Sequence, residues 1–408
     1  MPIQTPVLFE ITASDSHLPI LLPVLKILRE RGIPLILFSD CEILRTESRV
    51  SPLKEASIPY IQMAPRPLPG PDLDWELEAV PLRARIQAEV SRLHPSAVVV
   101  LNDRNFPSNT YINRARRLHI PTLLVQESLR KDLFQEPTLR KLIFRWRRKI
   151  LFGIEGGLRK YGQGRCDWYA AWGQTSVEYF CKVGVAPSRI RITGNPRFDQ
   201  LASARSDRSS PALRAELGLT PQAFLLTFLS SPIEKMLLVS AHEKEEALAR
   251  FLGWVRALRA EPAWRELTVV FKLHRGESAE RFREFLRIRQ AEEFARVAQL
   301  DLYPLLSSSD AALMFSTTAG LEAALLGIPL GILELAKSLD DWDLVGRGVA
   351  SAVASQEGLR GFLEKVRTAG DLGLQVREAA HSFFAHIGEA SRLVARMVEQ
   401  VAGGSVPQ

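Results

Sequence analysis

The chain has 408 residues, of which 46% are hydrophobic and 24% are charged. This composition is ordinary for a globular protein, and the length fits two domains of about 100–200 residues each. The apolar runs are strand-sized, short of the roughly 18 residues of a membrane-spanning helix, and the N-terminus lacks the basic start of a signal peptide, so we expect neither.

The first predicted elements form one supersecondary unit. Residues 7–11 are a short apolar run, 12–17 are polar, 18–31 have helical spacing that ends at Gly32, and 33–38 are apolar again. A strand, a helix, a glycine stop and a second strand in this order predict a βαβ unit of a parallel sheet.

The same alternation continues along the chain. Residues 201–211 are rich in Ser, Arg and Asp without apolar periodicity, which predicts a surface link between two halves. Further strands are predicted at 97–101, 122–126, 168–172 and 190–193 before the link and at 224–229, 267–273 and 311–315 after it, with helices at 175–183 and 374–401.

The three cysteines, Cys41, Cys166 and Cys181, are far apart in the sequence and accompany no histidine cluster. Structural zinc sites and disulfide frameworks have characteristic close spacings, which this chain lacks. We therefore expect free thiols in a reducing compartment and no metal site.

Ligands of open parallel sheets bind beyond the carboxyl ends of the strands, so the loops after strands are the candidate sites. In segment 316–329, hydroxyl and small residues follow a strand, and a helix opens with Glu322 in its first turns. The free N–H groups of a helix N-terminus suit a pyrophosphate, and Glu322 is placed to accept ribose or sugar hydroxyls. The alternative is a plain helix cap followed by a glutamate.

Three segments, in the same order, resemble a group within the GT-B glycosyltransferase superfamily. This group contains non-hydrolysing UDP-N-acetylglucosamine 2-epimerases, glycerophosphotransferases that use CDP-glycerol, and capsule-polysaccharide transferases. The matching residues are Thr193, Gly194, Asn195, Pro196 and Asp199 before the link, Lys272 and His274 at a strand end, and Ser316, Glu322, Gly327 and Pro329.

The resemblance implies an α/β fold of the GT-B type, with two Rossmann-like domains and a cleft between them. Residues 1–200 are expected to form the acceptor-side domain, 212–373 the nucleotide-donor domain, and 374–408 a helix that crosses back to the N-terminal domain. The donor is implied as a substrate, with no cofactor and no obligate metal. The implied donor-binding residues are Asn195, Arg197, Ser230, Ser231, His274, Arg275, Ser316, Thr317, Thr318, Gly320 and Glu322.

The candidate catalytic residues are His17, Asp103 and His274. His274 is expected to donate to a donor phosphate as the leaving group departs, or else to be a histidine in a polar turn. His17 lies where GT-B transferases often have an acceptor loop. Asp103 is a candidate base, with a helix cap or a salt bridge to Arg104 as the alternative. Glu127 stands where related capsule transferases have the histidine of a strand-end Gln-His-Gly, so that match is incomplete.

Residues 130–165 are rich in Arg and Lys, with aromatic and aliphatic residues between them, in a chain of formal net charge +7. This pattern predicts contact with an anionic membrane surface, and the alternative is a solvated basic helix with a buried apolar face. No nucleic-acid-binding motif accompanies the charge, so we expect no nucleic-acid partner.

The sequence favours a glycosyltransferase that moves a sugar or glycerophosphate-type group from a nucleotide-activated donor to a glycan or lipid-linked acceptor. We expect it to be cytoplasmic, or peripheral on the inner face of the cell membrane. One alternative is an isomerase like the UDP-N-acetylglucosamine 2-epimerases, although 230–234 are Ser-Ser-Pro-Ile-Glu where those enzymes have His-Arg-Arg-Glu-Asn. The other alternative is a non-catalytic protein that binds a nucleotide sugar.

Overall fold

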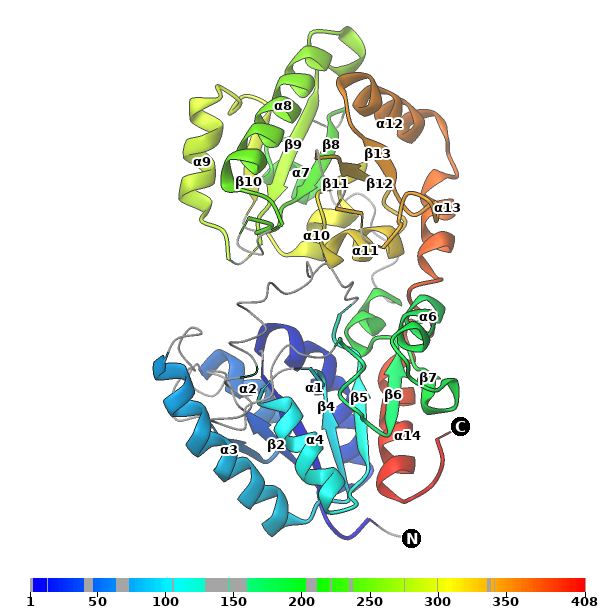
Figure 1. Ribbon diagram of the computed structural model, residues 1–408. Coiled ribbons are helices and arrows are strands. Elements are labelled where there is room, and N and C mark those ends of the chain that lie inside the picture. Colours follow the sequence, from blue (N-terminus) through cyan, green and yellow to red (C-terminus); the bar gives the residue numbers. More distant parts are fainter. Residues whose placement is uncertain are drawn as a thin grey trace. The chain divides into compact units, whose positions relative to one another are not determined.

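The computed structural model divides the chain into two compact units (Figure 1). Unit 1 contains residues 1–200 and 382–408, and unit 2 contains residues 201–381. The structure describes residues 3–12, 14–39, 47–63, 73–104, 106–128, 146, 160–202, 211–220, 222–234, 238–274, 276–298, 300–335, 339–340 and 342–407.

Unit 1 is built on a parallel sheet with the strand order β3-β2-β1-β4-β5-β6-β7. Val7 is in register with Leu35 on one side and with Ala97 on the other. The strands are apolar because helices cover both faces of the sheet. They are β1 (Val7–Ile11), β2 (Leu35–Ser39), β3 (Tyr60–Gln62), β4 (Ala97–Val100), β5 (Thr122–Val125), β6 (Trp168–Ala171) and β7 (Ile190–Ile192).

The helices of unit 1 lie on opposite faces of this sheet, as the alternation of strand side chains requires. Phe9 belongs to a buried cluster with residues of α1, α2 and α14, whereas its neighbour Leu8 belongs to a cluster with residues of α3, α4 and α6. The helices are α1 (Ser14–Glu30), α2 (Glu47–Glu55), α3 (Leu73–Leu93), α4 (Ser108–Arg117), α6 (Gln174–Lys182) and α14 (Ala390–Ala402), with 3-10 turns at Pro187–Arg189 and Pro196–Ala202.

Unit 2 has a second parallel sheet, with the order β10-β9-β8-β11-β12-β13. Its strands are β8 (Phe224–Leu229), β9 (Leu267–Lys272), β10 (Ala295–Ala298), β11 (Ala311–Met314), β12 (Leu330–Leu333) and β13 (Ser351–Val353). Its helices are α7 (Pro211–Glu216), α8 (Ala241–Arg259), α9 (Ala279–Ile288), α10 (Leu302–Ser307), α11 (Thr318–Leu325), α12 (Gln356–Thr368) and α13 (Leu372–Ala380), with a 3-10 turn at Pro262–Trp264.

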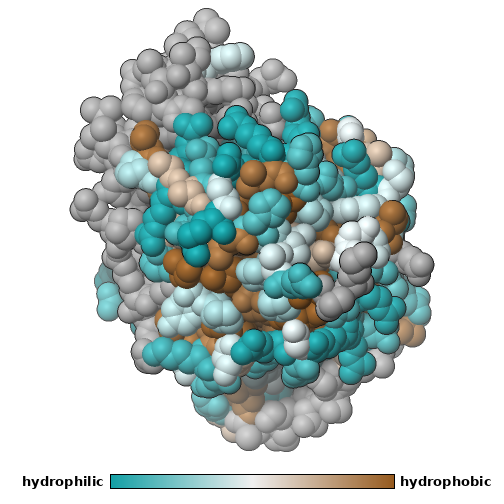
Figure 2. Space-filling model, turned by 90° about the horizontal axis from the view of Figure 1, so that it is seen from below, coloured by the Kyte–Doolittle hydropathy of each residue, from teal (hydrophilic) through white to brown (hydrophobic). Residues whose placement is uncertain are grey.

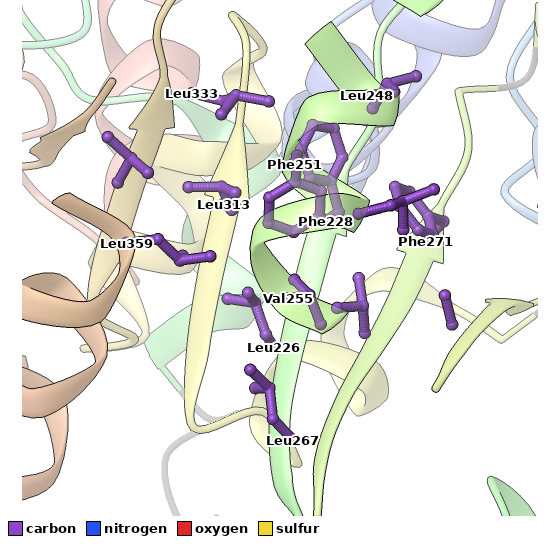
Figure 3. Close-up of a cluster of buried hydrophobic side chains, with 14 of the residues drawn as sticks. Leu226, Phe228, Leu248, Phe251, Val255, Leu267, Phe271, Leu313, Leu333 and Leu359 are labelled. Carbon is purple, nitrogen blue, oxygen red and sulfur yellow. The ribbon is translucent and has the colours of Figure 1, made fainter. Parts of the chain in front are cut away.

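Aromatic rings form the centre of one core of unit 2. Figure 3 shows Phe251 of α8 beside Phe228 of β8 and Phe271 of β9. The ring centroid of Phe228 lies 5.4 Å from that of Phe251 and 5.1 Å from that of Phe271, at tilted angles typical of packed aromatic pairs. Burial of these rings fixes α8, the helix that carries Lys244, against the sheet.

The prediction of one long C-terminal helix over 374–401 is wrong. The structure has two helices, α13 in unit 2 and α14 in unit 1, separated by residues 381–389. Within this return segment, Phe383 and Phe384 are fully buried, and His386 and Gly388 have positive φ angles of 54° and 94°. A helix cannot continue through such backbone angles, and α14, red in Figure 1, packs against α1 and β6.

Both sheets change strand order at one point. In unit 1, the first strand β1 lies between β2 and β4, and in unit 2, β8 lies between β9 and β11. Such an order creates a crevice at the carboxyl ends of the two strands that flank the switch, where open α/β sheets bind their ligands. The candidate ligand sites are therefore the loops after β1 and β4 and those after β8 and β11.

The surface in Figure 2 mixes hydrophilic residues with smaller hydrophobic patches. Among the described residues, Val80, Trp146, Ile288, Val345, Leu374 and Val406 are large hydrophobic side chains with substantial exposure. Exposed apolar residues of this kind are ordinary on soluble domains. No described helix combines the length and the apolarity needed to cross a membrane.

Candidate functional site

His17 lies at the switch point of unit 1, in the first turn of α1, because that helix begins at Ser14 instead of after the polar loop. Its ring is buried, with 1% exposure. The Thr12 N–H donates to His17 Nδ1 at 3.3 Å, and His17 Nε2 is hydrogen-bonded to Glu127 Oε2. Because Nδ1 accepts, the network assigns the ring proton to Nε2, which donates it to the carboxylate.

Glu127, which follows β5, is the centre of this cluster. Its second oxygen, Oε1, accepts a hydrogen bond from Asn102 Nδ2 at 3.1 Å, and its side chain is only 6% exposed. Its backbone N–H donates to the Tyr161 hydroxyl at 3.2 Å, which in turn donates to the Leu101 carbonyl at 3.1 Å. A buried imidazole–carboxylate pair held in this way can exchange a proton with a bound substrate.

Asp103 contributes to this arrangement indirectly. Its carboxylate is buried and accepts from the N–H of Gly162 at 3.0 Å and of Gly164 at 2.7 Å. Glycine is required at 164, because a Cβ atom there would lie 2.2 Å from the Asp103 carbonyl oxygen. Both oxygens thus anchor the turn that carries Tyr161, which argues against Asp103 as the base. These contacts differ from the helix cap that was one alternative, and the other alternative, a salt bridge to Arg104, stays a prediction.

The segment after β7 contacts the return segment of the chain. Gly194 has φ +77°, and a Cβ atom there would lie 2.3 Å from the Ala385 carbonyl oxygen. The carboxylate of Asp199 accepts from the N–H groups of Gly388, Ala390 and Ser391 at 2.8–3.0 Å. The motif that suggested donor binding therefore caps α14 and docks residues 382–391.

Asn195 and Arg197, predicted to bind the donor, belong to the same segment. Asn195 is buried and its Oδ1 accepts from the Arg197 N–H at 3.1 Å, which closes a local turn. The Asn195 Nδ2 atom is buried without a hydrogen-bond partner. Donor binding by these two residues stays a prediction.

Helix α11 opens at the switch point of unit 2. Thr317 is its N-cap, with a hydroxyl that accepts from the Ala319 N–H at 3.4 Å, and Ser316, Thr317 and Thr318 are half-buried. At Gly320, a Cβ atom would lie 2.2 Å from Met314 Sδ, so this residue serves the close packing of α11 on β11. The remaining N–H groups and the helix dipole make this turn suited to an anion.

Glu322 lies inside unit 2, with 1% exposure. Its Oε2 accepts a hydrogen bond of 2.6 Å from the hydroxyl of Tyr303 on α10. Tyr303 orients the carboxylate, and no sequence motif pointed to this tyrosine. Recognition of a ribose by Glu322 stays a prediction.

The loops after β8 and β9 hold the other predicted residues of unit 2. Ser231 is 4% exposed and its Oγ has no hydrogen-bond partner, whereas Ser230 Oγ donates to Glu277 at 2.8 Å. His274 is exposed, and its Nδ1 accepts from the Gly276 N–H at 3.1 Å, a local bond of the kind the alternative predicted. Arg275 lies outside the described residues.

Two features lie away from these loops. A pocket of about 510 Å³ is found at the opposite, amino-terminal edge of the unit 2 sheet, next to Ala223, Asp310 and Pro329, and no predicted site residue lines it. Of the basic segment 130–165, the structure describes only Trp146 and 160–165, so the membrane-surface prediction concerns residues outside the described ones.

The described residues offer neither a metal site nor a reactive thiol. No group of three or more His, Cys, Asp or Glu residues there is arranged to hold a metal ion. Cys166 and Cys181 are free thiols, and burial raises the pKa of Cys166 well above its ordinary value. Such a thiol is a poor nucleophile.

Neither a protein-family model nor a curated protein matches this chain. Solved structures do match over nearly the whole length. A putative UDP-N-acetylglucosamine 2-epimerase from Listeria monocytogenes has a TM-score of 0.66 at 14% identity, covering 99% of this chain and 98% of its own. The UDP-N-acetylglucosamine 2-epimerase of Neisseria meningitidis, bound to UDP-N-acetylglucosamine, has a TM-score of 0.63 at 13% identity, covering 97% of this chain and 100% of its own.

A third similar structure is HepE from Anabaena in complex with UDP and glucose, with a TM-score of 0.58 at 15% identity, covering 97% of this chain and 100% of its own. At these identities the likeness concerns the fold. It confirms the predicted α/β architecture of two Rossmann-like units of the GT-B type, and the resemblance to the group that contains the 2-epimerases.

Proposed function

We propose that this protein is an enzyme that acts on a nucleotide sugar, and that it epimerises the sugar. The observation that carries the proposal is the switch point of unit 2, where the open turn of α11 lies beside a loop with a buried, unpartnered serine hydroxyl. The three similar structures are nucleotide-sugar epimerases or a UDP complex, which supports epimerisation over the transfer that the sequence favoured.

In this proposal, the nucleoside diphosphate binds to unit 2. Its phosphates accept hydrogen bonds from the N–H groups at the start of α11 and from the Ser231 hydroxyl, for which no described residue is a partner. Glu322, already oriented by Tyr303, accepts a ribose hydroxyl. The substrate class is a UDP-N-acetylhexosamine, taken from what the similar proteins are named for.

Inversion of a C–H centre requires a group that removes the proton and a group that returns one to the opposite face. Glu127 and His17 form one mutually hydrogen-bonded acid–base pair, which we propose supplies one of these two groups. Such a pair contributes typically about 10²–10⁴-fold to a rate.

Transfer to an acceptor is the second candidate, and one observation favours it. The segment 230–234 lacks the His-Arg-Arg-Glu-Asn of the 2-epimerases and instead holds Ser230, Ser231 and Glu234. The two arginines of that epimerase segment therefore have no counterparts at 230–234.

A two-step experiment tests these functions. The purified chain is screened by thermal shift against UDP-, GDP-, CMP-, CDP- and dTDP-linked sugars, and UDP-N-acetylhexosamines are expected to raise the melting temperature by mass action. The sugar is then incubated with enzyme in D₂O. Epimerisation gives two epimers with deuterium at the inverted carbon. Release of UDP with a glycan acceptor, and no deuterium, would establish transfer instead. Binding without either reaction would indicate a non-catalytic protein, and no binding to any donor would refute the proposal.

A further inference from the structure

We propose that Lys244 and Glu277 are positioning residues that lock together the two loops at the carboxyl ends of β8 and β9. Neither residue belongs to the motifs that suggested a nucleotide site. The locking itself is independent of any ligand, and its effect on nucleotide affinity rests on the proposed function.

Lys244 lies in α8, and its side chain reaches into the loop after β8. It is 7% exposed, which is rare for a lysine unless it is paired. Its Nζ atom donates to the Ser231 carbonyl at 2.9 Å, to Glu234 Oε2 at 2.9 Å and to Glu277 Oε1 at 2.6 Å. An ammonium group has three N–H donors, so these contacts use all of them.

The number of N–H donors limits how Lys244 can act on a ligand. A lysine near a candidate phosphate site is ordinarily interpreted as a phosphate ligand. Here the ammonium has no donor left over, and two carboxylates already offset its charge. Lys244 therefore acts on a ligand through Ser231, whose backbone it holds, and not by direct contact.

Glu277 connects Lys244 to the second loop. Its Oε1 also accepts from Ser230 Oγ at 2.8 Å, and its Oε2 accepts from the backbone N–H of His274 at 2.8 Å. Its side chain is 7% exposed. One carboxylate thus joins the loop after β8 to the turn after β9, across two strands that pair along their full length.

The arrangement bears on the candidate nucleotide site because β8 also pairs with β11. The loop that Lys244 and Glu277 hold is the one that carries the Ser231 hydroxyl, beside the strand that leads into α11. A misplacement of reacting groups by about 1 Å can lower the rate of a catalysed reaction by as much as 10²-fold. Buried charge pairs are also screened little by salt, so the lock persists at physiological ionic strength.

The test uses the full chain with Lys244→Met, Glu277→Gln and the double variant. Glu284→Gln is the matched control, because Glu284 pairs with Arg287 at 2.6 Å in the same unit but both side chains are more than half exposed. Hydrogen exchange is measured without ligand on peptides covering 230–234 and 273–278, and UDP affinity is measured by calorimetry.

We expect Lys244→Met to raise exchange in 273–278 by about tenfold, although residue 244 reaches this turn only through Glu277. We expect both single variants to weaken UDP binding by about tenfold or more, with a non-additive effect in the double variant and none in the control. Lys244→Arg, which keeps the charge, is expected to restore much of the affinity.

Several outcomes would overturn the inference. Unchanged exchange in 273–278 in a folded Lys244→Met protein would show that the loops are not coupled. Unchanged UDP affinity in both single variants, with wild-type binding intact, would show that the pair is merely structural. If wild type binds no nucleotide, the proposed function fails, and the exchange result alone decides the coupling. If Lys244→Met does not fold, Glu277→Gln, which preserves side-chain volume, carries both measurements.

Discussion

Asp199 and Ser391 are 192 positions apart in sequence, yet the Asp199 Oδ2 atom accepts a 2.8 Å hydrogen bond from the Ser391 N–H. The other oxygen of the same carboxylate accepts from Gly388 and Ala390. A carboxylate at this place satisfies N–H groups that the first turn of α14 leaves open and interacts favourably with the helix dipole. The contact ties the last helix of the chain to the segment after β7.

Replacement of Asp199 tests this cap. Asp199→Ala is expected to lower the free energy of unfolding of unit 1 by about 1–2 kcal/mol, because three N–H groups lose their acceptor. Asp371→Ala is the control, since the Asp371 side chain precedes α13 without capping its backbone. This replacement is expected to lower the free energy of unfolding much less. Urea unfolding of both variants measures the difference, and equal losses would contradict the assigned role.

Two glycines with positive φ allow the cost of backbone strain to be measured separately from the cost of a close contact. Gly194→Ala and Gly184→Ala both impose strain, of about 1 kcal/mol, because alanine disfavours φ +77° and +96°. Only at 194 does the new Cβ atom also meet a backbone oxygen, that of Ala385, at 2.3 Å, whereas at 184 it meets open space. We expect Gly194→Ala to cost about 1–3 kcal/mol more than Gly184→Ala in chemical unfolding. A similar cost for the two would mean that the return segment does not pack closely there.

Glu127 and Asp103 both have carboxylates with little exposure, but we propose different roles for them. Glu127→Gln is expected to lower turnover by about 10²-fold or more, because the amide cannot take up a proton. Nucleotide binding is expected to be retained. Asp103→Asn is expected to lower stability by about 1–3 kcal/mol, because Gly162 and Gly164 lose charged acceptors. Turnover, calorimetric binding and urea unfolding of both variants separate the roles. Full activity in Glu127→Gln would remove it from the mechanism.

Asp310 provides a test by pH. Burial raises the pKa of Asp310 above its ordinary value of 3.8, against the opposing effects of the Leu225 N–H and Arg214. A raised native pKa means that the folded state prefers the protonated form, so this contribution to stability is present at low pH and is lost as the pH rises through the native pKa.

Asp310→Asn removes this titration while keeping one acceptor oxygen. Relative to wild type, the variant is therefore expected to gain stability as the pH rises from about 3 to 7. Urea unfolding of both proteins across this range measures the difference. A difference that is constant with pH, or that changes in the opposite direction, would show that burial of Asp310 does not govern its titration.

Much of the fold was predictable from local patterns. The strands at 7–11, 224–229 and 311–315 were predicted because apolar runs of that length, followed by polar loops, have few other solutions in an α/β protein. The start of α11 was predictable for the same reason, since Thr317 is a capping residue after a strand. The two-helix C-terminus was missed because the break at residues 381–389 lacks proline and its one glycine gives a weak signal.

The candidate site was predicted only in part. The sequence indicated the candidate loops after the strands. Ser231 lies in one of them, whereas His17 and Glu322 lie in the helices α1 and α11. The sequence did not predict that Asp103 and Asp199 bind backbone N–H groups, because the donors come from residues 59 to 192 positions away. Lys244 gave no signal at all, since a single lysine in an amphipathic helix is ordinarily exposed.

By itself, the sequence determined two Rossmann-like units of alternating strands and helices and the turn of α11, because propensity, periodicity and capping act over a few residues. Only the tertiary structure decided that Glu127 pairs with His17 and that Lys244 pairs with Glu277. Those partners are brought together because the carboxyl ends of parallel strands meet at one edge of a sheet. How deeply each pair is buried, and which hydrogen bonds it makes, depends on all the loops at that edge.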